Sequence, residues 1–113
     1  MATTYKVLGQ VATATLGATT EGTLYTVPSA TQAVVSTIVI ANQAGSSATY
    51  RIAVRPSADS STAAKHYVVY GATVAASDSI MLTLGITLAA SDKIQVYAST
   101  ATMSFSVFGS EIA

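Results

Sequence analysis

The last third of the chain, Ser79 to Glu111, alternates between apolar and polar or small residues in three successive runs. Because neighbouring residues of a strand point to opposite faces, each run predicts a β-strand with one apolar face. The apolar positions are Ile80, Leu82, Leu84, Ile86 and Leu88, then Ile94, Val96 and Ala98, then Met103, Phe105 and Val107. Short polar breaks separate the runs, so this region predicts a β-meander with an apolar inner face.

The preceding residues add five further strand predictions, at Thr3–Val11, Thr23–Val27, Val34–Asn42, Thr49–Arg55 and Lys65–Tyr70. A period of 3.6 residues is sustained nowhere, so little or no helix is expected. About eight strands at this spacing predict an all-β protein, an antiparallel β-sandwich of jelly-roll type, with an immunoglobulin-like sandwich as the second choice. Residues 1–113 form one predicted domain, in which residues 1–11 are either an N-terminal arm or the first strand.

The segment Val34–Asn42 is apolar on both of its predicted faces, with Val34, Ile38 and Ile40 on one and Val35 and Val39 on the other. This pattern is typical of a strand that is covered on both sides. Across the chain, the residues predicted to be buried are Ile38, Ile40, Ile52, Leu82, Ile94, Val96 and Phe105.

Two stretches of the chain echo each other. Gly71–Ile80 and Gly85–Ile94 both contain Ala-Ala-Ser-Asp shortly before an Ile that opens a strand. Two copies are too few for a repeat architecture. The similarity therefore predicts one Asx-type turn that is used twice.

Charged residues make up only 9% of the chain, and the formal net charge is zero. A surface this poor in charge suits a protein that is covered in an assembly. The five Lys and Arg residues are scattered, which argues against a nucleic-acid partner. No apolar run approaches the ~20 residues of a membrane helix. The chain has no cysteine and therefore no disulfide framework. The N-terminal residues lack the apolar segment typical of a signal peptide, so we expect synthesis in the cytoplasm.

The candidate chemical groups do not form a catalytic or metal-binding pattern. His66 is the single histidine, and no nucleophile motif accompanies it, so it predicts a structural role and no enzyme activity. The five acidic residues lack metal-ligand spacing, and no cofactor motif is present. Six tyrosines could form a glycan-binding surface, but Tyr50, Tyr67 and Tyr97 fall at strand positions where core or interface packing is the simpler interpretation.

Five segments carry a resemblance to a known group of proteins: Leu24–Pro28, Val35–Asn42, Gly85–Leu88, Asp92–Val96 and Val107–Glu111. With these strands and turns the chain resembles the small β-sandwich virion proteins of tailed bacteriophages, especially the capsid decoration (cement) proteins of cyanophages. The resemblance implies a homotrimer on the capsid exterior that binds the phage major capsid protein and stabilises contacts between its subunits. A tail, baseplate or fibre component and a receptor- or glycan-binding module are the alternatives.

The N-terminal segment provides the candidate assembly residues, Tyr5, Lys6, Val7 and Leu8. A free tail would expose the apolar side chains of Tyr5, Val7 and Leu8 to water. An extended arm could instead add a strand to the sheet edge of a neighbouring copy. The alternative, that Tyr5 to Gln10 is the first strand of the chain's own sandwich, carries equal weight.

Overall fold

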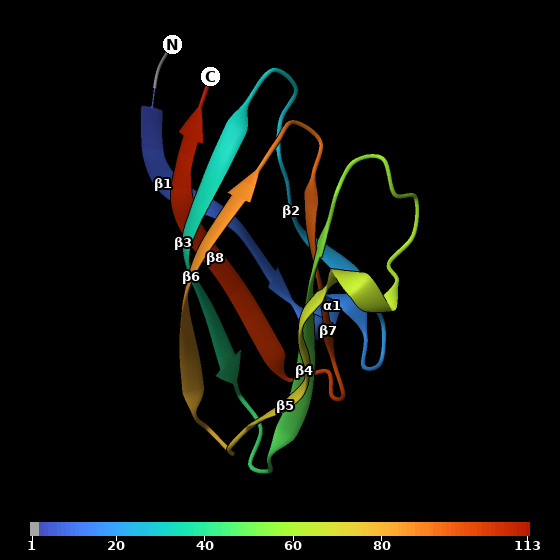
Figure 1. The fold of residues 1–113 in the computed structure, drawn as a ribbon. Coiled ribbons are helices and arrows are strands. Elements are labelled where there is room, and N and C mark those ends of the chain that lie inside the picture. The colour runs from blue at the N-terminus through green and yellow to red at the C-terminus, as the bar shows by residue number, and fades with distance from the viewer. Residues whose placement is uncertain (1–2) are drawn as a thin grey trace.

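The computed structural model describes residues 3–113 and consists almost entirely of antiparallel strands (Figure 1). Its two helical segments are single turns of four and three residues, in line with the expectation of little helix. The elements are β1 (Thr3–Ala12), α1 (Thr13–Leu16), β2 (Gly22–Thr26), β3 (Gln32–Asn42), β4 (Ala48–Arg55), η1 (Ala64–His66), β5 (Tyr67–Val74), β6 (Ser79–Leu88), β7 (Lys93–Ala98) and β8 (Met103–Ile112).

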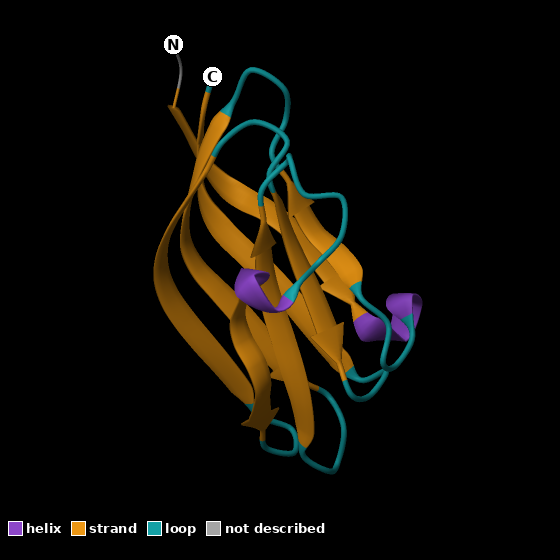
Figure 2. Cartoon of the chain, turned by 45° about the vertical axis from the view of Figure 1, so that its right-hand side comes forward, coloured by secondary structure: helices purple, strands orange, loops and turns teal. Residues whose placement is uncertain are grey.

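The strands form two four-stranded sheets packed face to face as a sandwich (Figure 2). Sheet A has the order β1-β8-β3-β6, and sheet B has the order β2-β7-β4-β5. β4 pairs with β5, β3 with β6, β2 with β7 and β1 with β8, as in one long hairpin that has been rolled up. This is the jelly-roll arrangement, so the expected fold is confirmed and the immunoglobulin-like order is not the one observed.

The expected β-meander in the last third of the chain is wrong. β6 and β8 lie in sheet A, whereas β7 lies between β2 and β4 in sheet B. The three runs are strands as predicted, but the turns between them cross from one sheet to the other (Figure 1). Alternation identifies the apolar face of a strand, but it does not identify the strand's hydrogen-bonding partner.

The core lies between the two sheets and contains nearly all of the residues predicted to be buried. Each of the six that are buried is no more than 1% exposed: Ile38, Ile40, Ile52, Ile94, Val96 and Phe105. Leu82 differs, since it is only half-buried at the margin of the core. β6 is an edge strand of sheet A, and its inward side chains are therefore covered from one side only.

A β-bulge in β3 reverses the pattern of its side chains. Val35 and Thr37 lie opposite adjacent residues of β8, which leaves Ser36 as an extra residue between them. The Ser36 hydroxyl donates a hydrogen bond to the Phe108 carbonyl oxygen at 3.1 Å. The expectation that Val34 shares a face with Ile38 and Ile40 is therefore wrong, because Val34 points outward and Val35 is fully buried.

The two Ala-Ala-Ser-Asp segments form the same turn, as predicted. In both, the Asp N–H donates to the carbonyl of the first Ala, at 3.2 Å in Ala75–Asp78 and 3.1 Å in Ala89–Asp92. The third residue has a positive φ in both, 54° at Ser77 and 69° at Ser91, as a type II turn requires. The Asx-type bond expected for each Asp is not formed, because Asp78 accepts the N–H of Ser79 at 2.8 Å and Asp92 accepts that of Ala89 at 2.9 Å.

Candidate interaction surfaces

The outer face of sheet A carries no charged side chain among the described residues. Cross-strand register places its members in rows, one of which is Tyr5, Ser110, Val34 and Thr87. We call this surface the sheet A face. It consists of Tyr5, Val7, Gln10, Ala12, Gln32, Val34, Thr37, Val39, Ala41, Ser79, Met81, Thr83, Thr87, Ser104, Ser106, Phe108, Ser110 and Ile112.

The sheet A face also holds most of the large apolar side chains that the described part of the chain exposes. Tyr5 is 83% exposed, Met81 70%, Val7 47% and Val34 37%. Elsewhere within residues 3–113, only Val68 and Tyr70, both in β5, expose comparable apolar groups. A continuous apolar and hydroxyl surface without charge is typical of a protein contact.

The four residues predicted for assembly lie in β1, at the edge of sheet A, where the strand pairs with β8 of the same chain. The segment is therefore the first strand of its own sandwich within the described residues. Tyr5 and Val7 point outward onto the sheet A face. Lys6 points to the opposite side, and Leu8 is the extra residue of a bulge that packs partly against the core.

Lys6 and Tyr25 converge on one carboxylate, that of Glu111 in β8. The Lys6 Nζ lies 2.7 Å from Glu111 Oε1, and the Tyr25 hydroxyl donates to Oε2 at 2.5 Å. These hydrogen bonds, from Lys6 first and Tyr25 second, hold the pKa of Glu111 below its usual value. Burial, followed by the neighbouring carboxylate, raises the pKa of Tyr25. The cluster ties β1 and β2 to the last strand.

A shallow hollow of about 460 Å³ interrupts the sheet A face beside the bulges of β1 and β3. Tyr5, Val34 and Phe108 form its apolar walls, and Lys6, which pairs with Glu111, also lines it. Gly109 forms part of its floor, where β8 passes so close to β3 that a Cβ atom would lie 2.0 Å from the Val34 carbonyl oxygen. The close approach of β8 to β3 therefore requires a glycine at this position.

The outer face of sheet B has a different chemistry. Arg51 in β4 is flanked by its two cross-strand partners, Tyr70 in β5 and Tyr97 in β7. Its guanidinium carbon lies 4.2 Å from the centre of each ring, close enough for cation–π attraction to both. Tyr67 packs edge-on against Tyr70, with ring centres 4.9 Å apart. Of the three strand tyrosines expected in the core or an interface, Tyr50 lies in the core, whereas Tyr67 and Tyr97 are half-buried.

His66 holds the loop between β4 and β5. It is buried, and its Nδ1 accepts the Ala63 N–H at 2.8 Å. Its proton is therefore on Nε2, which lies 2.8 Å from Asp59 Oδ2. This contact is the main cause that lowers the pKa of the Asp59 carboxyl. The arrangement accounts for His66 as a structural residue.

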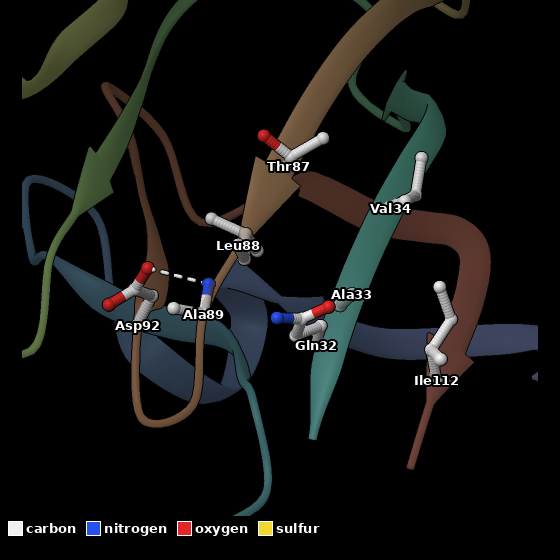
Figure 3. Close-up of a pocket in the computed structure, with 8 residues that line it drawn as sticks. All are labelled: Gln32, Ala33, Val34, Thr87, Leu88, Ala89, Asp92 and Ile112. Atoms are coloured by element: carbon white, nitrogen blue, oxygen red, sulfur yellow. Dashed lines mark hydrogen bonds between the residues drawn. The ribbon is translucent and has the colours of Figure 1, made fainter. Parts of the chain in front are cut away.

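A second hollow, of about 400 Å³, lies at the end of the sandwich near the chain termini (Figure 3). Asp92 is its one carboxylate, but both oxygens accept backbone hydrogen bonds, from Ala89 and from Ser57, at 2.9 Å. The carboxylate is thus occupied in holding the turn. The remaining lining, which includes Gln32, Val34 and Ile112, continues the sheet A face.

Residues 3–113 contain no group of three or more His, Cys, Asp or Glu residues placed to hold a metal ion. In the same range, no helix is long and apolar enough to span a membrane.

The fold defines an eight-stranded jelly-roll sandwich, a class that includes proteins of virus particles. No protein-family model matches the chain, and no curated protein matches it significantly in sequence. Among solved structures, it is similar to a chain of infectious bursal disease virus, Gx strain (TM-score 0.57, 12% identity), covering 97% of this chain and 32% of that one. A chain of the T13 particle of the same virus gives a TM-score of 0.57 at 13% identity, with 97% and 29% covered.

The Drosophila NLP core, described as a pentamer that binds histones, is also similar, with a TM-score of 0.54 at 12% identity over 100% of both chains. At these identities the likeness concerns the fold. The chain spans about a third of the length of the viral chains, 32% and 29%.

The sequence did not identify most of the sheet A face as a site. Val34, Met81 and Phe108 come from three strands that become neighbours only through the rolled topology. One sequence signal did point to this surface, namely the apolar pattern on both faces of Val34–Asn42. In the structure, that strand is covered by the core on its inner side alone.

Proposed function

We propose that this protein is a non-enzymatic structural component of a virus particle, and specifically a bacteriophage capsid decoration (cement) protein. In this proposal it binds the capsid exterior as a homotrimer and stabilises contacts between major capsid subunits. The observation that carries the proposal is the sheet A face, which is four strands wide, free of charge among the described residues, and lined by Tyr5, Val7, Val34 and Met81.

The β3 strand supports an assembly role independently of exposure. Its outward residues Val34 and Val39 are apolar, as in strands that are covered on both sides. Within the chain only the inner side is covered, so a partner on the outer side completes the expected environment. The jelly-roll fold, which the chain shares with proteins of virus particles, supports a virion partner.

The proposed contact uses the sheet A face against the shell and the β1 edge against a neighbouring copy. An interface of standard size buries about 800 Å² on each partner. Tyr5 and Val7 lie where the face and the edge meet, so they contribute to both contacts. Because β1 is an edge strand, its unpaired backbone groups can accept a neighbouring strand. Three linked copies bind the shell more tightly than one through avidity.

The test of location is the copy number and position of the protein in purified particles, measured by quantitative mass spectrometry and electron cryo-microscopy. Hundreds of copies on the outer shell support the proposal. A dozen or fewer copies, or density confined to the tail, would replace it with a tail, baseplate or fibre role.

The test of the face compares Val34→Lys with Val68→Lys. Val34 lies on the sheet A face and Val68 on β5 of sheet B, and both are exposed valines in strands. Placing an uncompensated charge in a contact is expected to weaken binding to shells lacking the protein by at least about tenfold for Val34→Lys. Val68→Lys should bind like the wild type. Equal binding by both variants would show that the sheet A face is not the contact.

A further inference from the structure

The outer face of sheet B carries an arginine between two tyrosines, and the proposed assembly does not use this cluster. We propose that Arg51, Tyr70 and Tyr97, with the adjoining groove, bind a carboxylated sugar residue of an acidic polysaccharide. The site lies on the opposite side of the sandwich from the sheet A face. Sugar binding and capsid binding can therefore be tested independently of each other.

Two tyrosine rings flank the guanidinium of Arg51, but no carboxylate within residues 3–113 neutralises its charge. Register places one tyrosine on each side of it, and both rings lie 4.2 Å from the guanidinium carbon. The ion pairs of the described residues involve Lys6, Arg55 and Lys65, and none of them includes Arg51. No hydrogen bond from its side chain is found within residues 3–113 either.

The guanidinium carbon lies 4.2 Å from both ring centres, and no hydrogen bond or ion pair within residues 3–113 uses its N–H groups. These N–H groups can therefore meet a carboxylate, which a guanidinium matches in a bidentate geometry. The stacking fixes the side chain before a ligand arrives, so little conformational entropy remains to be lost on binding.

Tyr70 connects the arginine to a groove. The ring is 65% exposed, and it lines a groove of about 520 Å³ together with Thr62, Ala63, Ala64 and Tyr67. This volume is within the range of small-molecule sites, about 300–1,000 Å³. Exposed tyrosine rings offer an apolar surface for the C–H face of a sugar, while the tyrosine hydroxyls offer hydrogen bonds.

The walls of the groove are held in place. Tyr67 braces Tyr70 edge-on. The loop that carries Thr62 to Ala64 is fixed by His66, through Ala63 on one side and Asp59 on the other. Thr62 also donates to Glu21 at 2.7 Å, which ties the loop to the segment before β2.

The charges favour a sugar carboxylate over other anions. Nucleic acids are bound by clustered cations, whereas Arg55 and Lys65 near this site already face Glu21 and Asp59. A single free guanidinium beside an exposed aromatic ring fits one carboxylate attached to one ring-shaped apolar surface.

The experiment is a titration of the full chain with trigalacturonate, followed by ¹H–¹⁵N spectra that include the arginine side-chain Nε–H. The methyl ester of the same trisaccharide is the neutral control. Triglutamate and a short single-stranded oligonucleotide represent the other anions. We expect trigalacturonate to bind at millimolar or lower concentration, with the largest shifts at Arg51, Tyr70 and Tyr97, and the other three probes to bind at least about tenfold more weakly.

Arg51→Lys retains the charge but removes the planar donors, and Tyr70→Ala removes the stacking surface. Each is expected to weaken trigalacturonate binding by at least about tenfold, while Tyr5→Ala, an exposed tyrosine on the sheet A face, changes it by less than about twofold. If either site variant fails to fold, the chemical-shift changes of the wild-type protein on adding trigalacturonate locate the binding site. Changes centred away from Arg51, Tyr70 and Tyr97 would overturn the proposed site.

Equal binding of the methyl ester would overturn the role of Arg51. Equal or tighter binding of triglutamate or the oligonucleotide would overturn the assignment to a sugar, and the absence of any binding at millimolar concentration would overturn the site itself.

Discussion

The hydroxyl of Tyr25 in β2 lies 2.5 Å from Oε2 of Glu111 in β8, and this hydrogen bond joins sheet B to sheet A beside the ends of the chain. The same carboxylate accepts the Lys6 ammonium of β1 at 2.7 Å. Three strands that are distant in sequence thus depend on one side chain.

We expect Glu111→Gln to lower the free energy of unfolding at neutral pH by about 1.5–3 kcal/mol, the usual contribution of a hydrogen bond to a charged group. Tyr25→Phe should cost less, about 1 kcal/mol, because the Lys6 contact remains. Urea unfolding of both variants and of the double variant measures the coupling. Additive effects would show that the two side chains act independently.

The same carboxylate predicts a pH dependence. Its folded-state pKa lies below the ordinary value of 4.5, so between the two values the unfolded chain binds more protons than the folded one. Its stabilising contribution is therefore complete above the unfolded-state pKa and is lost as the pH falls through the folded-state pKa. Thermal unfolding at decreasing pH should show a shallower acid decline for Glu111→Gln. The decline should not vanish, because Asp59 also has a lowered pKa.

Thr13 offers a test of a buried hydroxyl in the α1 turn. Its Oγ1 accepts the Met103 N–H at 2.9 Å and lies 2.9 Å from the Thr100 carbonyl oxygen, to which it can donate. Thr13→Val should cost about 1–3 kcal/mol, since it leaves a buried N–H without a partner. Thr13→Ser retains the hydroxyl and is expected to cost less in the same chemical unfolding experiment. A loss confined to Thr13→Ser would point to methyl packing instead.

Replacement by alanine should affect the stability of the protein differently at Gly109 and at Gly85, two glycines of sheet A. A Cβ at Gly109 would lie 2.0 Å from a backbone oxygen, whereas a Cβ at Gly85 meets nothing within 4 Å. Gly109→Ala is expected to cost more than about 2 kcal/mol through overpacking. Gly85→Ala should be neutral or slightly stabilising. Similar melting temperatures for the two variants would contradict the close approach of β8 and β3.

Deleting residues 2–8 distinguishes a free arm from a first strand. Because Thr3 to Leu8 belong to β1, the deletion removes pairing with β8 and the Lys6–Glu111 contact. We expect a strongly destabilised or unfolded chain by circular dichroism. A truncated protein of near-normal stability that no longer assembles would instead favour the arm.

The sequence predicted the strands and most of the core because alternation reports the environment of each side chain directly. It placed Ile38, Ile94 and Phe105 in the core correctly, since each lies in a regular stretch of strand. It misplaced Val34, because the bulge at Ser36 depends on the register of β8, a strand some seventy residues further on.

The surfaces were harder to predict than the core. Arg51 lies over the ring of Tyr97 only because β4 pairs with β7, and no local sequence pattern predicts that strand pairing. The absence of charge on the sheet A face likewise emerges only after four separate strands are brought side by side. Composition indicated a covered surface, but the face itself required the topology.

The rolled-hairpin topology also predicts the order in which the strands pair during folding. Closing a chain segment is entropically easier when its ends are near in sequence, so β4–β5 pairing is expected first, then β3–β6, β2–β7 and finally β1–β8. The last step adds β1 and completes the surface that carries Tyr5 and Val7. A half-folded chain therefore lacks the finished surface, so in the proposed assembly each copy would associate only after its own folding is complete.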